Sequence, residues 1–160
     1  MIFIFLHSER SDQPGISQPH RKHKYFLVSG LVGNETALPP VIFTDDATLP
    51  EMTFENAYVI TIASSKAPSV QSSLVWFDTI KEYLEDKPLL LLDNLKAHHN
   101  NSFQEELHDF EVSTMFYPPL TRCLLNPCDN AFHSTLKCKY LQKDRNTHQA
   151  CIKSMIESYY

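Results

Sequence analysis

A short apolar run that ends in a carboxylate constrains the fold of this chain more than any other feature. Residues 89–92 read Leu-Leu-Leu-Leu, and Asp93 follows the run directly. Four or five consecutive apolar residues have the length of a strand that is buried on both faces. A carboxylate at the C-terminal end of such a strand emerges at the edge of the sheet, where α/β proteins bind their ligands. We therefore expect residues 89–92 to form a central strand with Asp93 at a site.

A second carboxylate, Asp129, lies in the segment Asn-Pro-Cys-Asp-Asn at residues 126–130, just ahead of a helical pattern. A carboxylate in the first turn of a later helix can meet Asp93 at the sheet edge. Two facing carboxylates are the minimum for holding a hard divalent cation, and such a cation supports phosphate chemistry. The pair therefore raises metal-dependent phosphate chemistry as a hypothesis.

Both carboxylates also have purely structural interpretations. Asn126 as N-cap, Pro127 at the first helical position and Asp129 in the first turn make a good helix start without any function. The helix dipole favours an acidic residue there by roughly 0.3–1 kcal/mol. Asp93 and Asn94 after a strand also suit an ordinary turn. Taken one at a time, the two motifs are consistent with helix capping and turn formation as well as with a shared site.

Length and charge limit the class of protein. The 160 residues suffice for one domain with a single sizeable core, and the net charge is −5. Nucleic-acid-binding proteins usually carry a basic surface, and the net negative charge of this chain does not indicate one. Basic residues nevertheless gather in two segments, which either contact phosphate or form a solvated face. The first segment is residues 21–24, and the second contains Lys137, Lys139, Lys143 and Arg145.

The four cysteines, at positions 123, 128, 138 and 151, show no paired framework. No secretory leader is visible, and the apolar residues 2–6 are too few for a signal sequence or a membrane span. We therefore expect reduced thiols in an intracellular compartment, used as small core residues. Cys123, Cys128 and His133 invite a zinc interpretation, but their spacing fits none of the usual closed structural sites.

The order of hydrophobic patterns predicts a mixed sheet flanked by helices, an α/β class. Residues 25–44 should form an antiparallel hairpin, and residues 120–125 a loop. This order matches the ribonuclease H-like fold, in which acidic residues gather at one edge of the sheet. We expect one such domain over residues 1–145 and a C-terminal helix over residues 146–160. Strands are predicted at residues 2–6, 25–32, 38–44, 57–62, 89–92 and 111–117. Helices are predicted from residue 69 to before Pro88, through about residue 108 with Asn101 or Ser102 as the N-cap, at 132–144 and at 146–158.

Four stretches, in this order, resemble the DDE superfamily of transposases and endonucleases, in particular the mariner and pogo-like DNA transposases. In the family, a hairpin with a Pro-Pro strand precedes a helix, a strand-Asp-Asn-x-x-x-His motif and a Pro-Pro loop that leads to Asn-Pro-x-acidic-Asn. Residues 94–128, which are 35 residues, separate the two acidic positions, close to the spacing typical of the family. The matching stretches are residues 25–44 (YFLVSGLVGNETALPPVIFT), 76–84 (WFDTIKEYL), 89–98 (LLLLDNLKAH) and 117–137 (YPPLTRCLLNPCDNAFHSTLK).

The resemblance implies cut-and-paste DNA transposition, in which three carboxylates hold two Mg²⁺ or Mn²⁺ ions. On this basis Asp93 would bridge the metals and Asp129 would bind one of them. Asn94 and His98 would donate hydrogen bonds near the scissile phosphate, although His98 and His99 also suit the surface of a loop. The implied partner is DNA in the nucleus, with no membrane and with a homodimer as a candidate assembly. Further DNA contacts are expected from Lys137 and Lys139.

The chain departs from the family pattern at the first carboxylate, which should end the first strand. The expected position falls on His7 or Ser8, so Glu9 is the remaining candidate for a catalytic ligand. Adjacent strand residues point to opposite faces, so a one-residue slip aims a carboxylate wrongly. Without the first carboxylate, two close cations lack charge compensation, and one weak metal site should remain.

We therefore predict a DDE-type domain with impaired catalysis, truncated before the family's N-terminal DNA-binding region. A second hypothesis is a domesticated transposase fragment that binds DNA or protein without chemistry. A third is an unrelated α/β nuclease or phosphatase that uses Asp93 and Asp129.

Overall fold

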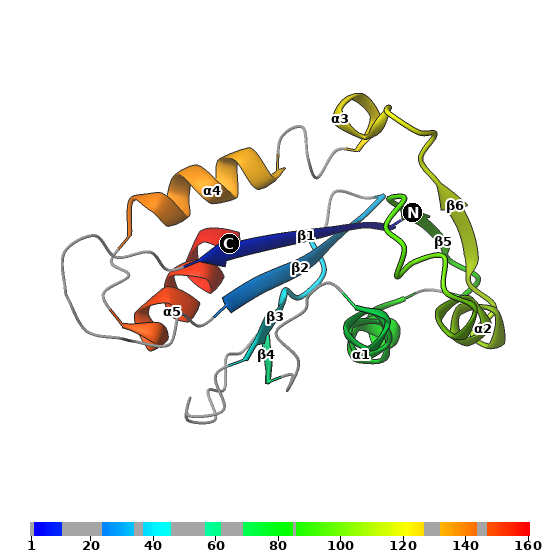
Figure 1. The fold of residues 1–160 in the computed structure, drawn as a ribbon, viewed down its shortest axis with the longest axis horizontal. Coiled ribbons are helices and arrows are strands. Elements are labelled where there is room, and N and C mark those ends of the chain that lie inside the picture. The colour runs from blue at the N-terminus through cyan, green and yellow to red at the C-terminus, as the bar shows by residue number, and fades with distance from the viewer. Residues whose placement is uncertain are drawn as a thin grey trace.

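The computed structural model describes residues 2–10, 24–33, 37–45, 57–61, 69–84, 86–126, 132–143 and 147–160. In these ranges the strands form one six-stranded sheet, and helices lie on both sides of it (Figure 1). This arrangement confirms the α/β class and the mixed sheet flanked by helices. The strands are β1 (Ile2–Arg10), β2 (Lys24–Val32), β3 (Val41–Thr44), β4 (Tyr58–Thr61), β5 (Leu89–Leu92) and β6 (Ser113–Phe116). The helices are α1 (Val70–Ile80), the 3₁₀ turn η1 (Lys81–Tyr83), α2 (Asn101–Asp109), α3 (Arg122–Leu125), α4 (His133–Leu141) and α5 (His148–Tyr159).

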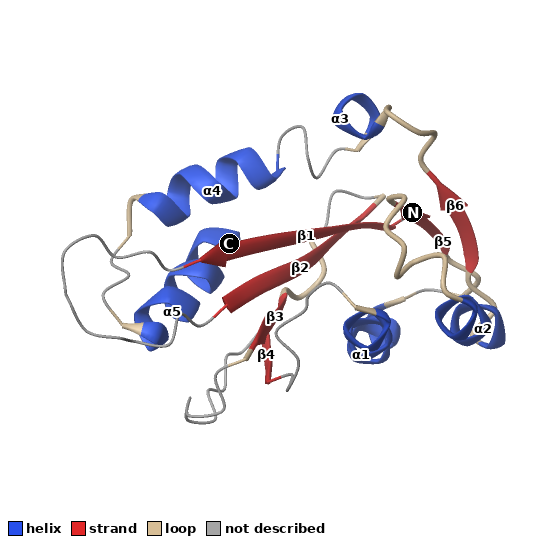
Figure 2. Cartoon of the chain, in the orientation of Figure 1, coloured by secondary structure: helices blue, strands red, loops and turns tan. Residues whose placement is uncertain are grey.

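The sheet has the order β4-β3-β2-β1-β5-β6 (Figure 2). Strand β2 is antiparallel to both β1 and β3, as the predicted hairpin requires. Strand β5 is parallel to its neighbours β1 and β6. The C-terminal ends of β5 and β6 therefore meet at one edge of the sheet, beside β1, and this edge is where ligands bind in open α/β sheets.

The core is divided by the sheet, because apolar side chains alternate between its two faces. Along β2, Phe26 and Val28 belong to the cluster that contains α1 and α2, whereas Tyr25 and Leu27 belong to the cluster that contains α4 and α5. Successive strand residues point to opposite faces, so a run of apolar residues marks a strand covered on both sides. Figure 1 shows α1 and α2 on one side of the sheet and α4 and α5 on the other.

Polar side chains fix the helix starts. Ser69 caps α1 and forms a capping box with Ser72, which confirms the predicted start. Thr147 caps α5 by accepting a hydrogen bond from the amide of Ala150. Helix α2 is capped by Asn100, whose side chain accepts from the amide of Ser102. The prediction of Asn101 or Ser102 as this cap was wrong by one or two positions, because three consecutive Asn, Asn and Ser residues suit the same role.

Several predicted bounds were wrong, among them the end of α1, which stops at Ile80 and continues only as η1 to Tyr83, and the start of β6, which is Ser113 instead of residue 111. Strand β1 continues beyond residue 6 to Arg10, because β2 pairs with it along its whole length, up to Arg10 opposite Lys24. Strand β3 starts at Val41 instead of residue 38, since the two preceding prolines lack the amide hydrogen that a ladder needs. The segment predicted as a loop at residues 120–125 contains α3.

The cysteines in the described part of the chain behave differently from one another. Cys151 on α5 is buried in the core, as predicted, whereas Cys138 on α4 is exposed, so the core prediction was wrong there. Neither residue forms a disulfide bond. The side chains of Cys123, Cys128 and His133, which raised zinc as an alternative, lie outside the described side chains.

Tyr159 joins α5 to the sheet, and it provides a test of that packing. Its buried hydroxyl donates a hydrogen bond of 2.6 Å to the carbonyl of Leu38. Because Tyr159→Phe removes this donor, we expect the free energy of unfolding in urea to fall by about 0.5–1.5 kcal/mol. The exposed neighbour provides the control, Tyr160→Phe, which should change it by less than about 0.5 kcal/mol. Equal losses in the two variants would contradict a specific contribution from the Leu38 bond.

Candidate active site

Asp93 lies buried at the C-terminal end of β5, with 7% of its surface exposed. One carboxylate oxygen, Oδ1, accepts a hydrogen bond of 3.3 Å from the amide of Leu95, which makes a local Asx turn. The same oxygen lies 2.9 Å from Nδ1 of His98. The amide of His98 bonds to the carbonyl of Leu95 at 2.9 Å, so the chain turns back on itself directly after the strand. The four-leucine run thus delivers Asp93 to the predicted edge, and the turn after it brings His98 alongside.

His98 is held in place on several sides. It is only 2% exposed, and its ring packs near the ring of Phe103 at a centroid distance of 5.8 Å. Its carbonyl accepts a hydrogen bond of 2.7 Å from Nε2 of Gln104, and Oε1 of Gln104 accepts one of 3.2 Å from the hydroxyl of Thr114. The interpretation of His98 as a surface loop residue was wrong, because its ring has both an apolar neighbour and a carboxylate partner in the interior.

Asn94 and His99 lie on the exposed side of the same turn. The side-chain amide of Asn94 donates to the carbonyl of Tyr117, which follows β6. Its oxygen Oδ1 lies 3.2 Å from Nε2 of His99, and the His99 ring stacks on Phe116. The edge beside Asp93 therefore consists of side chains from the ends of both β5 and β6. Sequence reasoning named Asn94 and mentioned His99, but it missed Phe116, because nothing in the sequence pairs a residue of β6 with the turn after β5.

The first strand supplies no acidic residue level with Asp93. Ile2 pairs with Leu90 and Phe3 with Leu91. Continued two residues further along both strands, this register sets Phe5 level with Asp93. Glu9 lies four residues beyond Phe5, roughly 13 Å along the strand at about 3.3 Å per residue. Within the ladder Glu9 pairs with Tyr25. The backbone therefore does not bring Glu9 and Asp93 together.

Asp129 lies outside the described residues, as does Pro127, so both the metal-site and the capping interpretations of Asp129 stay predictions. Asn126, the last described residue before that segment, is buried. Among the described residues no group of three or more His, Cys, Asp and Glu side chains is placed to hold a metal ion. The carboxylate oxygens of Asp93 suit a hard cation such as Mg²⁺. The sequence predicts that Asp129 supplies a second carboxylate, and this stays a prediction.

The predicted basic residues of α4 differ in their surroundings. Lys137 and Lys139 are exposed on the helix, as a contact with phosphate would require. Lys143 lies just beyond the helix, and its Nζ donates a hydrogen bond of 3.0 Å to Glu157 of α5. This bond is the main reason that the pKa of the Glu157 carboxyl is lowered. Part of the positive charge of the basic segment is therefore neutralised by an acidic residue of the same fold.

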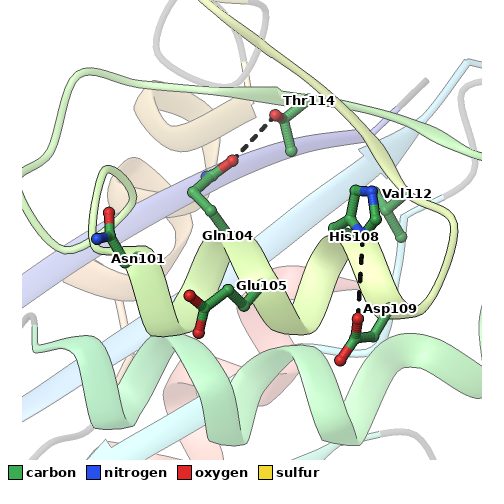
Figure 3. A pocket seen from close by; sticks show the side chains of 7 residues that line it. All are labelled: Asn101, Gln104, Glu105, His108, Asp109, Val112 and Thr114. Carbon is green, nitrogen blue, oxygen red and sulfur yellow. Dashed lines mark hydrogen bonds and ion pairs between the residues drawn. The ribbon is translucent and has the colours of Figure 1, made fainter.

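A separate hollow of about 440 Å³ is lined by residues of α2 and of the start of β6. Figure 3 shows Gln104 reaching from α2 to Thr114 of β6, and His108 beside Asp109. Asp93 and the two histidines after it are not among the lining residues, so this hollow is distinct from the edge described above. Its lining consists of Asn101, Gln104, Glu105, His108, Asp109, Val112 and Thr114.

The fold and the edge define a class: a mixed α/β domain that presents a buried carboxylate at the end of a parallel strand. A family model described as DDE superfamily endonuclease matches residues 33–158 of this chain. The match spans well over half of the sequence, and the chain belongs to the DDE superfamily endonuclease family. This membership confirms the resemblance that the sequence motifs indicated.

One relative, described as the MFS-type transporter clz9 of Cochliobolus lunatus, is 25% identical over 142 residues. The aligned region covers 83% of this chain but only 16% of that protein. The chain therefore spans a small part of this relative. In the described part of this chain, no helix has both the length and the apolar character that crossing a membrane requires.

Proposed function

We propose that this chain is a ribonuclease H-like, catalytic-type domain derived from a DNA transposase, with metal-dependent DNA strand cleavage and transfer as its ancestral reaction. Membership of the DDE superfamily endonuclease family supports a transposase-like nuclease. The sheet supports the fold assignment, because an antiparallel β1–β2–β3 unit is extended on the other side of β1 by two parallel strands. Family membership also contradicts the hypothesis of an unrelated nuclease or phosphatase.

The observation that carries the proposal is the position of Asp93, buried at the end of the strand next to β1 and fixed by two hydrogen-bonding partners. In this proposal Asp93 and Asp129 would hold Mg²⁺ or Mn²⁺, and the bound ion would supply activation of a water or a DNA 3′-hydroxyl and stabilisation of the leaving oxygen. Exposed Lys137 and Lys139 contact the DNA backbone, and Asn94 lies at the edge that the phosphate approaches.

Catalysis is impaired in this proposal, because the position level with Asp93 on β1 is Phe5. The negative charge of two carboxylates balances the charge of one divalent cation better than that of two cations, so one metal site remains. The alternative is a non-catalytic domain that binds DNA or protein, and the net charge of −5 favours it over full activity. A homodimer and a nuclear location stay predictions from the resemblance.

The proposal is tested with the whole chain, by measuring Mn²⁺ binding calorimetrically and by measuring binding and nicking of a labelled DNA duplex at low and at physiological salt. We expect one Mn²⁺ per chain, duplex binding that weakens steeply with salt, and little nicking. Duplex binding without any Mn²⁺ binding would favour the non-catalytic alternative. A chain that binds neither Mn²⁺ nor DNA would overturn the proposal.

His98 has a testable positioning role in this site. Because its Nδ1 lies against Oδ1 of Asp93, it orients the carboxylate as a second layer of contacts around a metal does. We expect His98→Leu to weaken Mn²⁺ binding by about 10–100-fold. His98→Asn keeps a donor at the position of Nδ1 and should restore most of the affinity. Calorimetry measures the affinity, and near-ultraviolet circular dichroism checks the fold. Equal affinities in the Leu and Asn variants would contradict a role for the hydrogen bond.

A further inference from the structure

A pair of stacked rings, His99 and Phe116, lies at the edge beside Asp93. The imidazole of His99 lies on the ring of Phe116 with centroids 4.1 Å apart and an angle of 18° between the planes. His99 is exposed, and Phe116 is half-buried in β6. Phe116 covers one face of the imidazole, so the surface that His99 exposes lies on its other face and its rim.

Hydrogen bonds fix the orientation of this pair. The carbonyl of Tyr117 can only accept a hydrogen bond, so the NH₂ group of Asn94 points to it. The carbonyl oxygen of Asn94 is then left facing Nε2 of His99 at 3.2 Å, and it too can only accept. Nε2 of His99 therefore carries the proton and donates. The imidazole is held in one plane before any ligand arrives, which lowers the entropy cost of binding a flat partner.

The stacked pair is adjacent to the candidate metal ligand. Asn94, which orients His99, directly follows Asp93, and consecutive Cα atoms are about 3.8 Å apart. Phe116 ends β6 opposite Leu92, the residue before Asp93. A DNA strand whose phosphate lay at Asp93 would bring its neighbouring nucleotides to the level of this pair.

We propose that His99 and Phe116 form a stacking platform for an unpaired nucleobase next to the phosphate that a cation at Asp93 would hold. The proposal rests on the proposed function, because it requires DNA at this edge. Recognition is through the ring face, since Nε2 of His99 is engaged by Asn94. Every base has a π face, so the platform tolerates any base. Bases inside a duplex are stacked on both sides, so the ligand is DNA with an overhang, a gap or a splayed end.

The test uses two DNA probes and the whole chain. One probe is a duplex with a single-nucleotide 3′ overhang of 2-aminopurine, and the other is the same duplex with blunt ends. Fluorescence anisotropy measures affinity, and the 2-aminopurine intensity reports stacking of the overhanging base. For wild type we expect tighter binding of the overhang probe and quenching of its fluorescence.

Substitutions separate stacking from other contacts. We expect His99→Ala to weaken binding of the overhang probe by about 5–150-fold, the range that base–aromatic stacking gives, and to abolish quenching. His99→Phe keeps a ring face and should retain both. Phe116→Leu keeps an apolar support without a ring and should lose part of the affinity and of the quenching. The exposed His108→Ala on α2 is the matched control and should match wild type.

The outcomes distinguish this proposal from the proposed function. A wild-type chain that binds neither probe overturns both. A wild-type chain that binds DNA, with equal affinity and equal quenching in His99→Ala, overturns the platform and leaves the proposed function standing. If His99→Ala is unfolded by circular dichroism, the comparison of Phe116→Leu with wild type decides: unchanged quenching in that variant overturns the platform.

Discussion

Asp93→Ala is expected to abolish the binding of Mn²⁺ by this domain. Asp93 is the carboxylate that the fold delivers to the end of β5, and the proposed site has one further acidic ligand, Asp129. Substitutions around metal ligands typically cost about 10–100-fold in affinity, so removal of a ligand itself should exceed about 100-fold. Calorimetric titration with Mn²⁺ measures the loss, and Asp129→Ala should give a loss of the same order.

The matched control for this experiment is Asp109→Ala, because Asp109 is an exposed aspartate at the end of α2. It should leave Mn²⁺ binding unchanged. Full Mn²⁺ affinity in Asp93→Ala would contradict the proposed site and would move the metal to another part of the chain. Loss in Asp93→Ala with no loss in Asp129→Ala would leave Asp93 as a ligand and favour the capping interpretation of Asp129.

The second large effect concerns the fold itself. Phe77 of α1 is fully buried and belongs to the cluster between the sheet and the helices α1 and α2. Because Phe77→Ala leaves a cavity in this cluster, we expect the free energy of unfolding to fall by about 3–5 kcal/mol. Urea denaturation followed by circular dichroism measures the change.

Phe110 provides the control for Phe77, because the two rings meet edge to face at 5.6 Å while Phe110 is 44% exposed. Phe110→Ala removes the ring contact without opening a buried cavity, so its cost should stay below about 1.5 kcal/mol. If Phe77→Ala lowered the free energy of unfolding no more than Phe110→Ala, this result would contradict the packing of α1 on the sheet.

The proposed site is incomplete by the standard of three carboxylates, and the reason lies in β1. The register of β1 against β5 sets Phe5 level with Asp93, while the acidic Glu9 lies further along the strand. An apolar residue at that level cannot share a cation with Asp93. Metal binding, DNA binding and nicking therefore have to be measured separately, because this edge can retain the first two without the third.

Local patterns were sufficient to predict most elements. The run of four leucines predicted β5 with its bounds, because four or five consecutive apolar residues have the length of a buried strand. Leu90 and Leu92 are buried, and Leu89 and Leu91 are half-buried. Ser69 predicted the start of α1, since a hydroxyl at that position satisfies an amide of the first turn. Asp93 was predicted at the sheet edge for the same local reason: it is the first polar residue after a buried strand.

Features that depend on long-range pairing were not predictable in this way. The polar residues at the end of β1 form a strand only because β2 pairs with them, as Glu9 does with Tyr25. His98 is buried because Asp93 and Phe103 surround it, although its own segment reads as a loop. The contact of His99 with Phe116 joins two segments that meet only when β5 and β6 pair.

The sequence by itself determined the α/β class, the family and the acidic residue at the end of β5, because these follow from local apolar runs and from motifs in order. The tertiary structure alone decided which residues surround that carboxylate. Strand register set Phe5 level with Asp93, and chain reversal after β5 placed His98 against it. Register and burial are properties of paired strands and packed turns, so they arise only when segments distant in sequence come together.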